Sequence, residues 1–322
     1  MKFILVLIFF LNVFLLSQPS FLGSGTIDDP YQIWTKEHLL ELSDSVNSNN
    51  SYLIYPPGGY GRWCTNKHFC LMQDIDTFTQ SIGWKPFTGY LHGKEKKISV
   101  SISYTGLVIS FIFSGITGIN NTIDSLTLNG YLSGWGVSGI FRSNGSSSSI
   151  TECINNTALI SENPNDGIIG GITGSNSGTI SHCINNSSVS GVDFVAGIAT
   201  VNNWIIENCI NTGKVTGTEF ANNNYNGVAG IACASHIASN CINLGEITGI
   251  NNISGIVGIA QYFGVGPLPK ISNCINAGYI KGNKYVSSIL GYMEGNIPIT
   301  NCINTGVIEG EEDVGSIVGG EK

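Results

Sequence analysis

The stretch that decides the fold is NCINLGEITG, residues 240–249. Its central tripeptide, Cys-Ile-Asn, occurs six times, at spacings of 30, 26, 32, 33 and 28 residues. The six copies begin at Cys153, Cys183, Cys209, Cys241, Cys274 and Cys302. Each copy has an aliphatic residue six positions after the cysteine, and most copies have a segment of the form Val/Ile-x-Gly/Ser-Ile further on. A self-similar unit of this length predicts a repeat architecture.

The composition of the repeat selects one architecture. Each copy contains three short extended pieces separated by Gly, Asn and Ser turns and has no amphipathic helix, which excludes helical repeats. Propeller blades need ~40–50 residues and are too long for these spacings. A degenerate copy at 123–134, with Leu126 in place of Cys, precedes the six. The sequence therefore predicts an all-β fold, a right-handed parallel β-helix (β-solenoid) of about seven regular coils.

Stacked coils place equivalent side chains above one another, so the repeat predicts two structural ladders. One is the ladder of the six cysteines. The other consists of Asn155, Asn185, Asn211, Asn243, Asn276 and Asn304. We expect the asparagines to hydrogen-bond from coil to coil and to occupy a left-handed corner of the backbone.

The repeat predicts the position of the cysteine ladder but does not by itself decide whether its thiols form disulfides. Parallel Cβ vectors suit a disulfide poorly, so unpaired packed thiols are favoured over bonds between coils. Leu126 indicates a small apolar slot at this position. A line of ligands does not suit tetrahedral zinc, and no metal or other cofactor is predicted.

The N-terminal part of the chain differs from the repeats. Residues 3–16 are an apolar run that fits the ~7–15-residue core of a secretory signal and is shorter than the ~20 residues of a membrane span. We expect residues 1–20 to be a cleaved signal peptide, with an uncleaved anchor as the alternative. Residues 21–118 would form a capping unit with irregular first coils, and residues 119–322 the regular repeats.

Two elements are predicted within the capping unit. Thr35 is positioned to cap a helix over about residues 35–46, which would cover the first coil with an apolar stripe. The stripe consists of Leu39, Leu40, Leu42 and Val46. Residues 52–70 are predicted to be an inserted loop, whose Cys64 and Cys70 would form a disulfide in a secreted protein.

Composition limits the classes of partner. Charged residues are 11% of the chain, against about 25% in a typical soluble protein, and 42 of 322 residues are Gly. The net charge is −8 and the only arginines are Arg62 and Arg142, which argues against a nucleic-acid partner. The acids near the C-terminal edge are expected to keep the protein a monomer. They are Glu309, Glu311, Glu312, Asp313 and Glu321.

No residue pattern satisfies the requirements of a catalytic site. His182 precedes Cys183, but adjacent strand residues point to opposite faces and cannot form a nucleophile and base pair. Asp124, Asp166 and Asp193 fall at different repeat positions. Aromatic residues in loops offer a possible glycan contact, or else serve as loop anchors. They are Trp135, Trp204, Tyr225, Tyr262 and Phe263.

The repeat resembles the GLUG motif of bacterial surface proteins and of the non-catalytic part of some immunoglobulin A peptidases. The resemblance is clearest over residues 240–258, and residues 23–33, 72–76 and 87–89 are similar to the unit that precedes such repeats. It implies an adhesin-like β-helical surface protein and supplies no catalytic residues. The sequence departs from the resemblance in that residues 21–322 show no cell-wall sorting motif, so the resemblance does not supply a means of surface attachment.

These observations predict a secreted or cell-surface adhesion or interaction module without catalytic activity, whose partner is an unknown surface protein or glycan. The alternatives are a carbohydrate-active β-helix enzyme with its site in the long loops, and a passive structural spacer. Seven sequons make a glycoprotein possible if the source glycosylates secreted proteins, although we expect Asn155 and Asn185 to stay unmodified. The sequons are at Asn49, Asn120, Asn144, Asn155, Asn185, Asn186 and Asn252.

Overall fold

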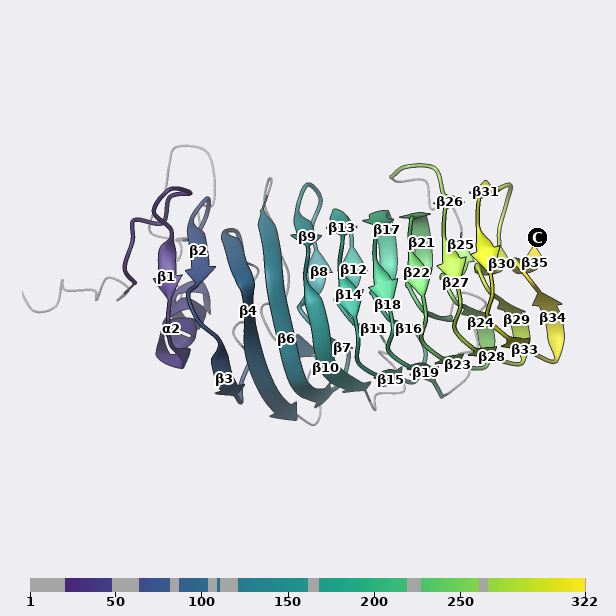
Figure 1. Cartoon of the computed structure of the whole chain (residues 1–322), viewed down its shortest axis with the longest axis horizontal. Coiled ribbons are helices and arrows are strands. Elements are labelled where there is room, and N and C mark those ends of the chain that lie inside the picture. The colour runs from purple at the N-terminus through teal and green to yellow at the C-terminus, as the bar shows by residue number, and fades with distance from the viewer. Residues whose placement is uncertain are drawn as a thin grey trace, which may run out of the picture.

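The protein is a parallel β-solenoid, which confirms the predicted fold class (Figure 1). The computed structural model describes residues 21–47, 64–81, 87–103, 109–110, 121–161, 168–218, 227–260 and 266–321. The coils stack in chain order along one axis, and every pairing between coils is parallel. The predicted signal peptide lies outside the described residues.

Within the described residues the strands form two sheets, of 27 and 8 strands. The strands that precede the Cys position are β1 (Tyr31–Ile33), β2 (His68–Leu71), β9 (Ser149–Thr151), β13 (Thr179–Ser181), β26 (Lys270–Ser272) and β31 (Ile299–Thr300). The Cys-Ile-Asn strands are β10 (Ile154–Ser161), β14 (Ile184–Asn185), β18 (Ile210–Asn211), β22 (Ile242–Asn243), β27 (Ile275–Asn276) and β32 (Ile303–Asn304). The next strands of the larger sheet are β15 (Val189–Gly191), β19 (Val215–Gly217), β23 (Ile247–Thr248), β28 (Ile280–Lys281) and β33 (Ile308–Glu309).

The smaller sheet closes the opposite side of the coil. Its strands are β5 (Ile109–Ser110), β7 (Val137–Ser138), β11 (Ile169–Gly170), β16 (Val195–Ala196), β20 (Val228–Ala229), β24 (Asn251–Ser254), β29 (Lys284–Ser287) and β34 (Glu312–Gly315). The return strands are β8 (Phe141–Asn144), β12 (Thr173–Asn176), β17 (Ala199–Glu207), β21 (Ala232–Ser239), β25 (Val257–Ala260), β30 (Leu290–Met293) and β35 (Val318–Glu321). The first coils use β3 (Ile75–Phe78) and the long β4 (Tyr90–Ser103) and β6 (Thr122–Gly134).

Each repeat contains more strands than the three predicted. Between Cys209 and Asn240, for example, the chain forms β18, β19, β20 and β21. A residue with positive φ precedes each Cys of the repeat and separates the Cys-Ile-Asn strand from the strand before it. These corner residues, with φ of 53° to 55°, are Glu152, His182, Asn208, Asn240, Asn273 and Asn301. The prediction that the Asn of Cys-Ile-Asn takes the left-handed corner is therefore wrong, because that residue lies in a strand.

The only helix of the described residues, α2 (Lys36–Asn47), covers the start of the solenoid (Figure 1). It begins one residue after the expected cap, and the Thr35 hydroxyl accepts a hydrogen bond from the His38 amide at 3.4 Å. Leu39 and Leu42 are fully buried and Val46 is nearly so, and all three belong to the continuous core. The apolar stripe thus closes the end of the core that the first coil would otherwise expose.

The predicted boundaries of the first coils need correction. The end of the inserted loop, residues 68–70, belongs to β2, because Phe69 and Leu71 face the core and Phe69 pairs in register with Leu91 of the next coil. Residues 98–103, within the irregular first coils, form the second half of β4. Residues 52–63 of the loop lie outside the described residues.

The last described coil is less covered than the others. Cys302, Asn304 and Ile308 are partly exposed, whereas their counterparts one coil earlier are fully buried. Lys284 pairs with Glu312 at 2.5 Å and Asp313 at 3.5 Å, and Lys281 lies 3.6 Å from Glu309. The preceding coil therefore neutralises part of the acidic edge. Within the described residues no helix is long and apolar enough to cross a membrane.

Candidate binding face

The interior of the solenoid contains the predicted asparagine ladder. The register aligns Leu128 and the six asparagines in consecutive coils, and Asn155 to Asn276 are fully buried. Each Nδ2 donates to Oδ1 of the next coil, at 2.8 Å for the first four bonds and 3.0 Å for the last. Each Nδ2 also donates to a backbone carbonyl two residues ahead. These bonds satisfy buried amides that would otherwise destabilise the core.

The glycine of the Val/Ile-x-Gly/Ser-Ile segment serves this ladder. Gly197 and Gly230 lie against the amides of Asn211 and Asn243, and a Cβ atom on either would be 2.4 Å from the amide oxygen. The glycine of this segment and the asparagine of the tripeptide therefore pack directly against each other. A second inner ladder, Asn144 to Asn176 to Asn202, has bonds of 2.6 and 2.7 Å. Sequence reasoning missed it because these asparagines lie outside the Cys-Ile-Asn pattern.

The six cysteines stack beside the asparagines as unpaired thiols. Each Sγ lies 3.2 to 3.3 Å from the carbonyl oxygen two residues earlier. Burial raises the pKa of the Cys153 and Cys183 thiols well above the ordinary value. A neutral buried thiol is a poor nucleophile, so these residues contribute packing.

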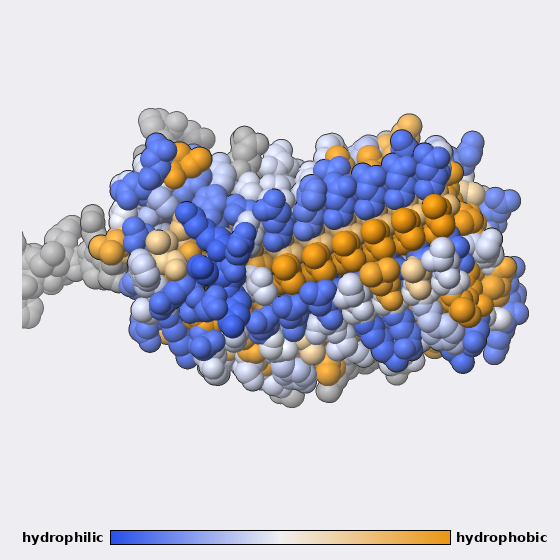
Figure 2. Space-filling model, in the orientation of Figure 1, coloured by the Kyte–Doolittle hydropathy of each residue, from blue (hydrophilic) through white to orange (hydrophobic). Residues whose placement is uncertain are grey.

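The isoleucine of each Cys-Ile-Asn points the other way. Side chains alternate along a strand, so the inward Cys and Asn force the residue between them outward. The six residues align in register and are partly exposed, and Ile303 reaches 53% exposure. They form the isoleucine ladder: Ile154, Ile184, Ile210, Ile242, Ile275 and Ile303. Figure 2 shows a straight apolar band along the regular coils, with hydrophilic bands beside it.

Two rows of mostly polar residues flank the isoleucine ladder. The first rail is the row of corner residues, Glu152, His182, Asn208, Asn240, Asn273 and Asn301. The second rail follows the ladder asparagines and consists of Asn156, Asn186, Thr212, Leu244, Ala277 and Thr305. Rail side chains bond along the axis, as from Asn273 to Asn240 at 3.0 Å and from Asn186 to Asn156 at 3.0 Å. The ladder and its rails together are the isoleucine face, on which Glu152 is the one carboxylate and His182 the one histidine.

The two described aromatics among those predicted as glycan contacts, Trp135 and Trp204, do not lie on one surface. Trp135 is 46% exposed and lies between β6 and β7, whereas Trp204 is 43% exposed and lies within β17, at a different side of the coil. Tyr225, Tyr262 and Phe263 lie outside the described residues. The described tryptophans therefore do not form a common sugar platform.

Burial separates the sequons. Asn144, Asn155 and Asn185 are fully buried and Asn252 is 3% exposed, so a glycan cannot be attached to them in the folded protein. Asn186 is exposed on the second rail. Asn49 and Asn120 lie outside the described residues.

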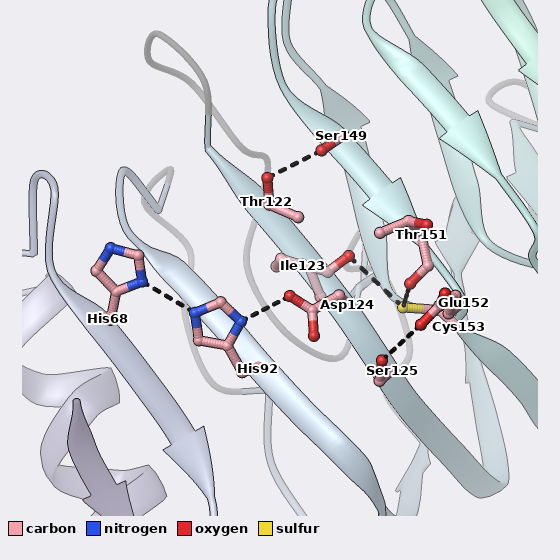
Figure 3. Close-up of polar contacts among 10 residues, drawn as sticks. All are labelled: His68, His92, Thr122, Ile123, Asp124, Ser125, Ser149, Thr151, Glu152 and Cys153. Atoms are coloured by element: carbon pink, nitrogen blue, oxygen red, sulfur yellow. Dashed lines mark hydrogen bonds and ion pairs between the residues drawn. The ribbon is translucent and has the colours of Figure 1, made fainter. Parts of the chain in front are cut away.

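A polar relay crosses the outer surface of the first coils (Figure 3). His92 on β4 lies between Asp124 on β6, with Nδ1 to Oδ2 at 2.6 Å, and His68 on β2, with Nε2 to Nδ1 at 2.9 Å. An ionised carboxylate can only accept, so with both rings neutral His92 donates from Nδ1 and accepts at Nε2. His68 then donates from Nδ1, and its ring stacks on Tyr90 at 4.2 Å. The relay joins three successive coils by their side chains.

The relay does not activate a nucleophile. Cys70 is aligned with His92, but His92 Nε2 bonds to His68, and burial raises the pKa of the Cys70 thiol. Among the described residues there is also no group of three or more His, Cys, Asp or Glu able to hold a metal ion.

The predicted disulfide between Cys64 and Cys70 does not form in the structure, where both side chains are buried and neither is in a disulfide. Cys64 belongs to the core and lies 3.3 Å from the Thr88 hydroxyl. Cys70 follows the core residue Phe69, so alternation directs its side chain to the other face of β2. The Cys64 sulfur therefore lies in the core and the Cys70 sulfur lies on the opposite face of β2.

Comparisons with known proteins bear on the fold. No protein-family model matches the sequence, and no curated protein matches it. The chain is similar to the crystal structure of a candidate immunoglobulin A1 protease from Bacteroides ovatus, with 17% identity, a TM-score of 0.51, and coverage of 92% of this chain and 80% of that one. It is also similar to a structure named IgA1 Protease, with 14% identity and a TM-score of 0.43, over 88% of this chain and 21% of that one. At such identities the first similarity shows a shared solenoid fold.

The relay predicts a dependence of stability on pH. Burial, and then repulsion by a protonated His92, lower the pKa of His68 below its ordinary value. A lowered folded-state pKa means that the unfolded chain binds protons first, so this contribution is complete above about pH 6.5 and is lost as the pH falls through the folded pKa. We expect the urea midpoint to fall between pH 7.5 and 5.5, and to fall less in His68→Gln. Equal changes in both proteins would contradict this role.

Proposed function

We propose that the protein is a non-catalytic interaction module of the cell exterior, and that the isoleucine face is its binding surface. The observation that supports this proposal is the row of six outward isoleucines. A soluble protein gains stability by burying such side chains, and a contiguous exposed apolar patch commonly marks an interaction site. The resemblance of the repeat to GLUG-motif surface proteins is in keeping with an adhesion role.

The geometry of the face suits binding and not catalysis. A catalytic site needs converging acids, bases or nucleophiles, whereas this face repeats one uncharged side chain along a straight line. Interfaces have an apolar centre with a polar rim, and the ladder and its two rails have that arrangement. The reading as a passive spacer gives no reason for isoleucine at every turn of the ladder, since any residue that favours strands would serve.

Binding of the labelled chain, from residue 21, to a glycan array and to cells that do and do not display this protein tests the proposal. The test variant carries Ile210→Lys and Ile242→Lys in the middle of the ladder. Lys97 occupies the same ladder position two coils before Ile154, with Thr127 between them, so lysine is compatible with the fold there. We expect at least a tenfold loss of binding, because a lysine must be desolvated in an apolar contact.

A matched control places the same charges on a different outer ladder. Thr216→Lys and Thr248→Lys lie in the row that contains Lys281 in the next coil, and they should leave binding unchanged. Equal binding by the test variant and the wild type would refute the isoleucine face as the binding surface. Absence of binding by a folded wild-type protein would favour the spacer.

A further inference from the structure

We infer that the partner of the isoleucine face is a second copy of this chain, so that the module binds homotypically. This inference rests on the proposed function and names the partner of the same face. The acidic C-terminal edge, which favours a monomer by preventing end-to-end pairing, is a different surface from the isoleucine face.

The first argument is the match in period. Successive isoleucines are one coil apart, about 4.8 Å along the axis. The surface of an unrelated globular protein has no such repeat, whereas a second copy repeats with the same spacing along its whole length. Two such ladders can interdigitate over all six positions, as identical side chains do between paired sheets of stacked strands. A two-fold interface requires this self-complementarity.

The second argument is charge. A two-fold axis in the plane of the face can lie along the solenoid or across it. In the first case Glu152 of one copy lies opposite the start of the second rail of the other copy, at Asn156. In the second case it lies opposite the far end of the first rail, at Asn301. Neither arrangement places two carboxylates together, so no like-charge repulsion opposes the contact.

The third argument concerns the polar rim. Within a rail, a bonded asparagine such as Asn273 donates once to its neighbour Asn240 and accepts once from Asn301. An amide has two donors and two acceptor sites, so each such residue retains one of each for a facing copy. The asparagines of the first rail can therefore hydrogen-bond to polar residues of a facing rail.

The size of the face sets the strength of the contact. Six rungs at about 4.8 Å and five residues at about 3.3 Å give roughly 900 Å² buried over both copies. Stable interfaces bury about 1,200–2,000 Å², so the dimer is expected to be weak and reversible. Copies displayed side by side on a surface would reach the required concentration more readily than free copies.

Sedimentation equilibrium of the purified chain, from low micromolar to millimolar concentration, tests this inference. The average mass should rise toward two chains for the wild type and for the Thr216→Lys, Thr248→Lys control. It should remain at one chain for the Ile210→Lys, Ile242→Lys variant, whose urea midpoint should match that of the control. A wild type that stays a monomer throughout, or a variant that still forms the dimer, would overturn the inference.

The two proposals fail separately. A monomeric wild type whose binding to a glycan or to cells lacking this protein is lost in the ladder variant would refute the second copy as partner and support the face as a binding surface. A dimer unaffected by the ladder variant would refute the second copy as the partner of this face, and equal binding of that variant and the wild type to cells or glycans would in addition refute the face as a binding surface.

Discussion

Replacing Asn211 by Leu should lower the free energy of unfolding by about 3 kcal/mol, as expected when buried hydrogen-bonding groups lose their partners. Asn211 is in the middle of the inner ladder, where its amide accepts from Asn185 and donates to Asn243 at 2.8 Å each. Leucine would leave the Asn243 oxygen without its donor inside a dry core. Urea denaturation followed by circular dichroism measures the change.

Asn155→Leu is the matched control. Asn155 is the first asparagine of its ladder and follows Leu128, so it bonds to only one ladder amide, that of Asn185. Its amide is also less tightly packed, because a Cβ atom on Gly139 would be 3.4 Å from the Asn155 Cγ, compared with 2.5 Å for Gly197 and Asn211. The loss should be about half as large, roughly 1–2 kcal/mol. Equal losses at both positions would show that coil-to-coil bonding does not determine the cost.

Gly230→Ala should destabilise the protein by a similar amount, about 3 kcal/mol, through overpacking. The new Cβ atom would be 2.2 Å from the Gly255 carbonyl oxygen and 2.4 Å from Asn243 Oδ1. Neither atom can withdraw alone, because one is backbone in the next coil and the other is fixed in the ladder. The melting temperature of the variant should fall by several degrees.

Ser288 provides the comparison for this substitution. The register aligns Gly230 with Gly255 and then with Ser288, where a Cβ atom is already accommodated. Ser288→Ala removes the hydroxyl that donates to the Ser316 carbonyl, and should cost about 1 kcal/mol or less. A Gly230→Ala protein as stable as the wild type would contradict the close approach of the two halves of the repeat.

The sequence was sufficient for the fold because the period of the repeat and its lack of helices admit few architectures. The same alternation that places Cys241 and Asn243 inside also requires Ile242 outside, so the isoleucine face was within reach of sequence reasoning. The signal was the isoleucine of each tripeptide, which lies between two residues that were already expected to point inward.

Other features depend on geometry that a single sequence does not contain. Asn240 and Asn243 are the same residue type three positions apart, yet the first takes the left-handed corner and the second an inward strand position. His68, His92 and Asp124 come together because loops of unequal length bring them onto neighbouring coils. Cys64 and Cys70 are close in sequence, but the Cys64 side chain lies in the core and the Cys70 side chain points to the other face of β2.

The asparagine ladder also has a consequence for how this protein can change in length. Every amide donates in the same direction, so the upper surface of one coil fits the lower surface of any other. Excision of residues 209–240 would bring Asn185 against Asn243 with the same order of donor and acceptor. Whole coils are therefore interchangeable units, and each gain or loss of a coil extends or shortens the isoleucine ladder by one residue. Mutations that add or remove coils would therefore change the strength with which the face binds.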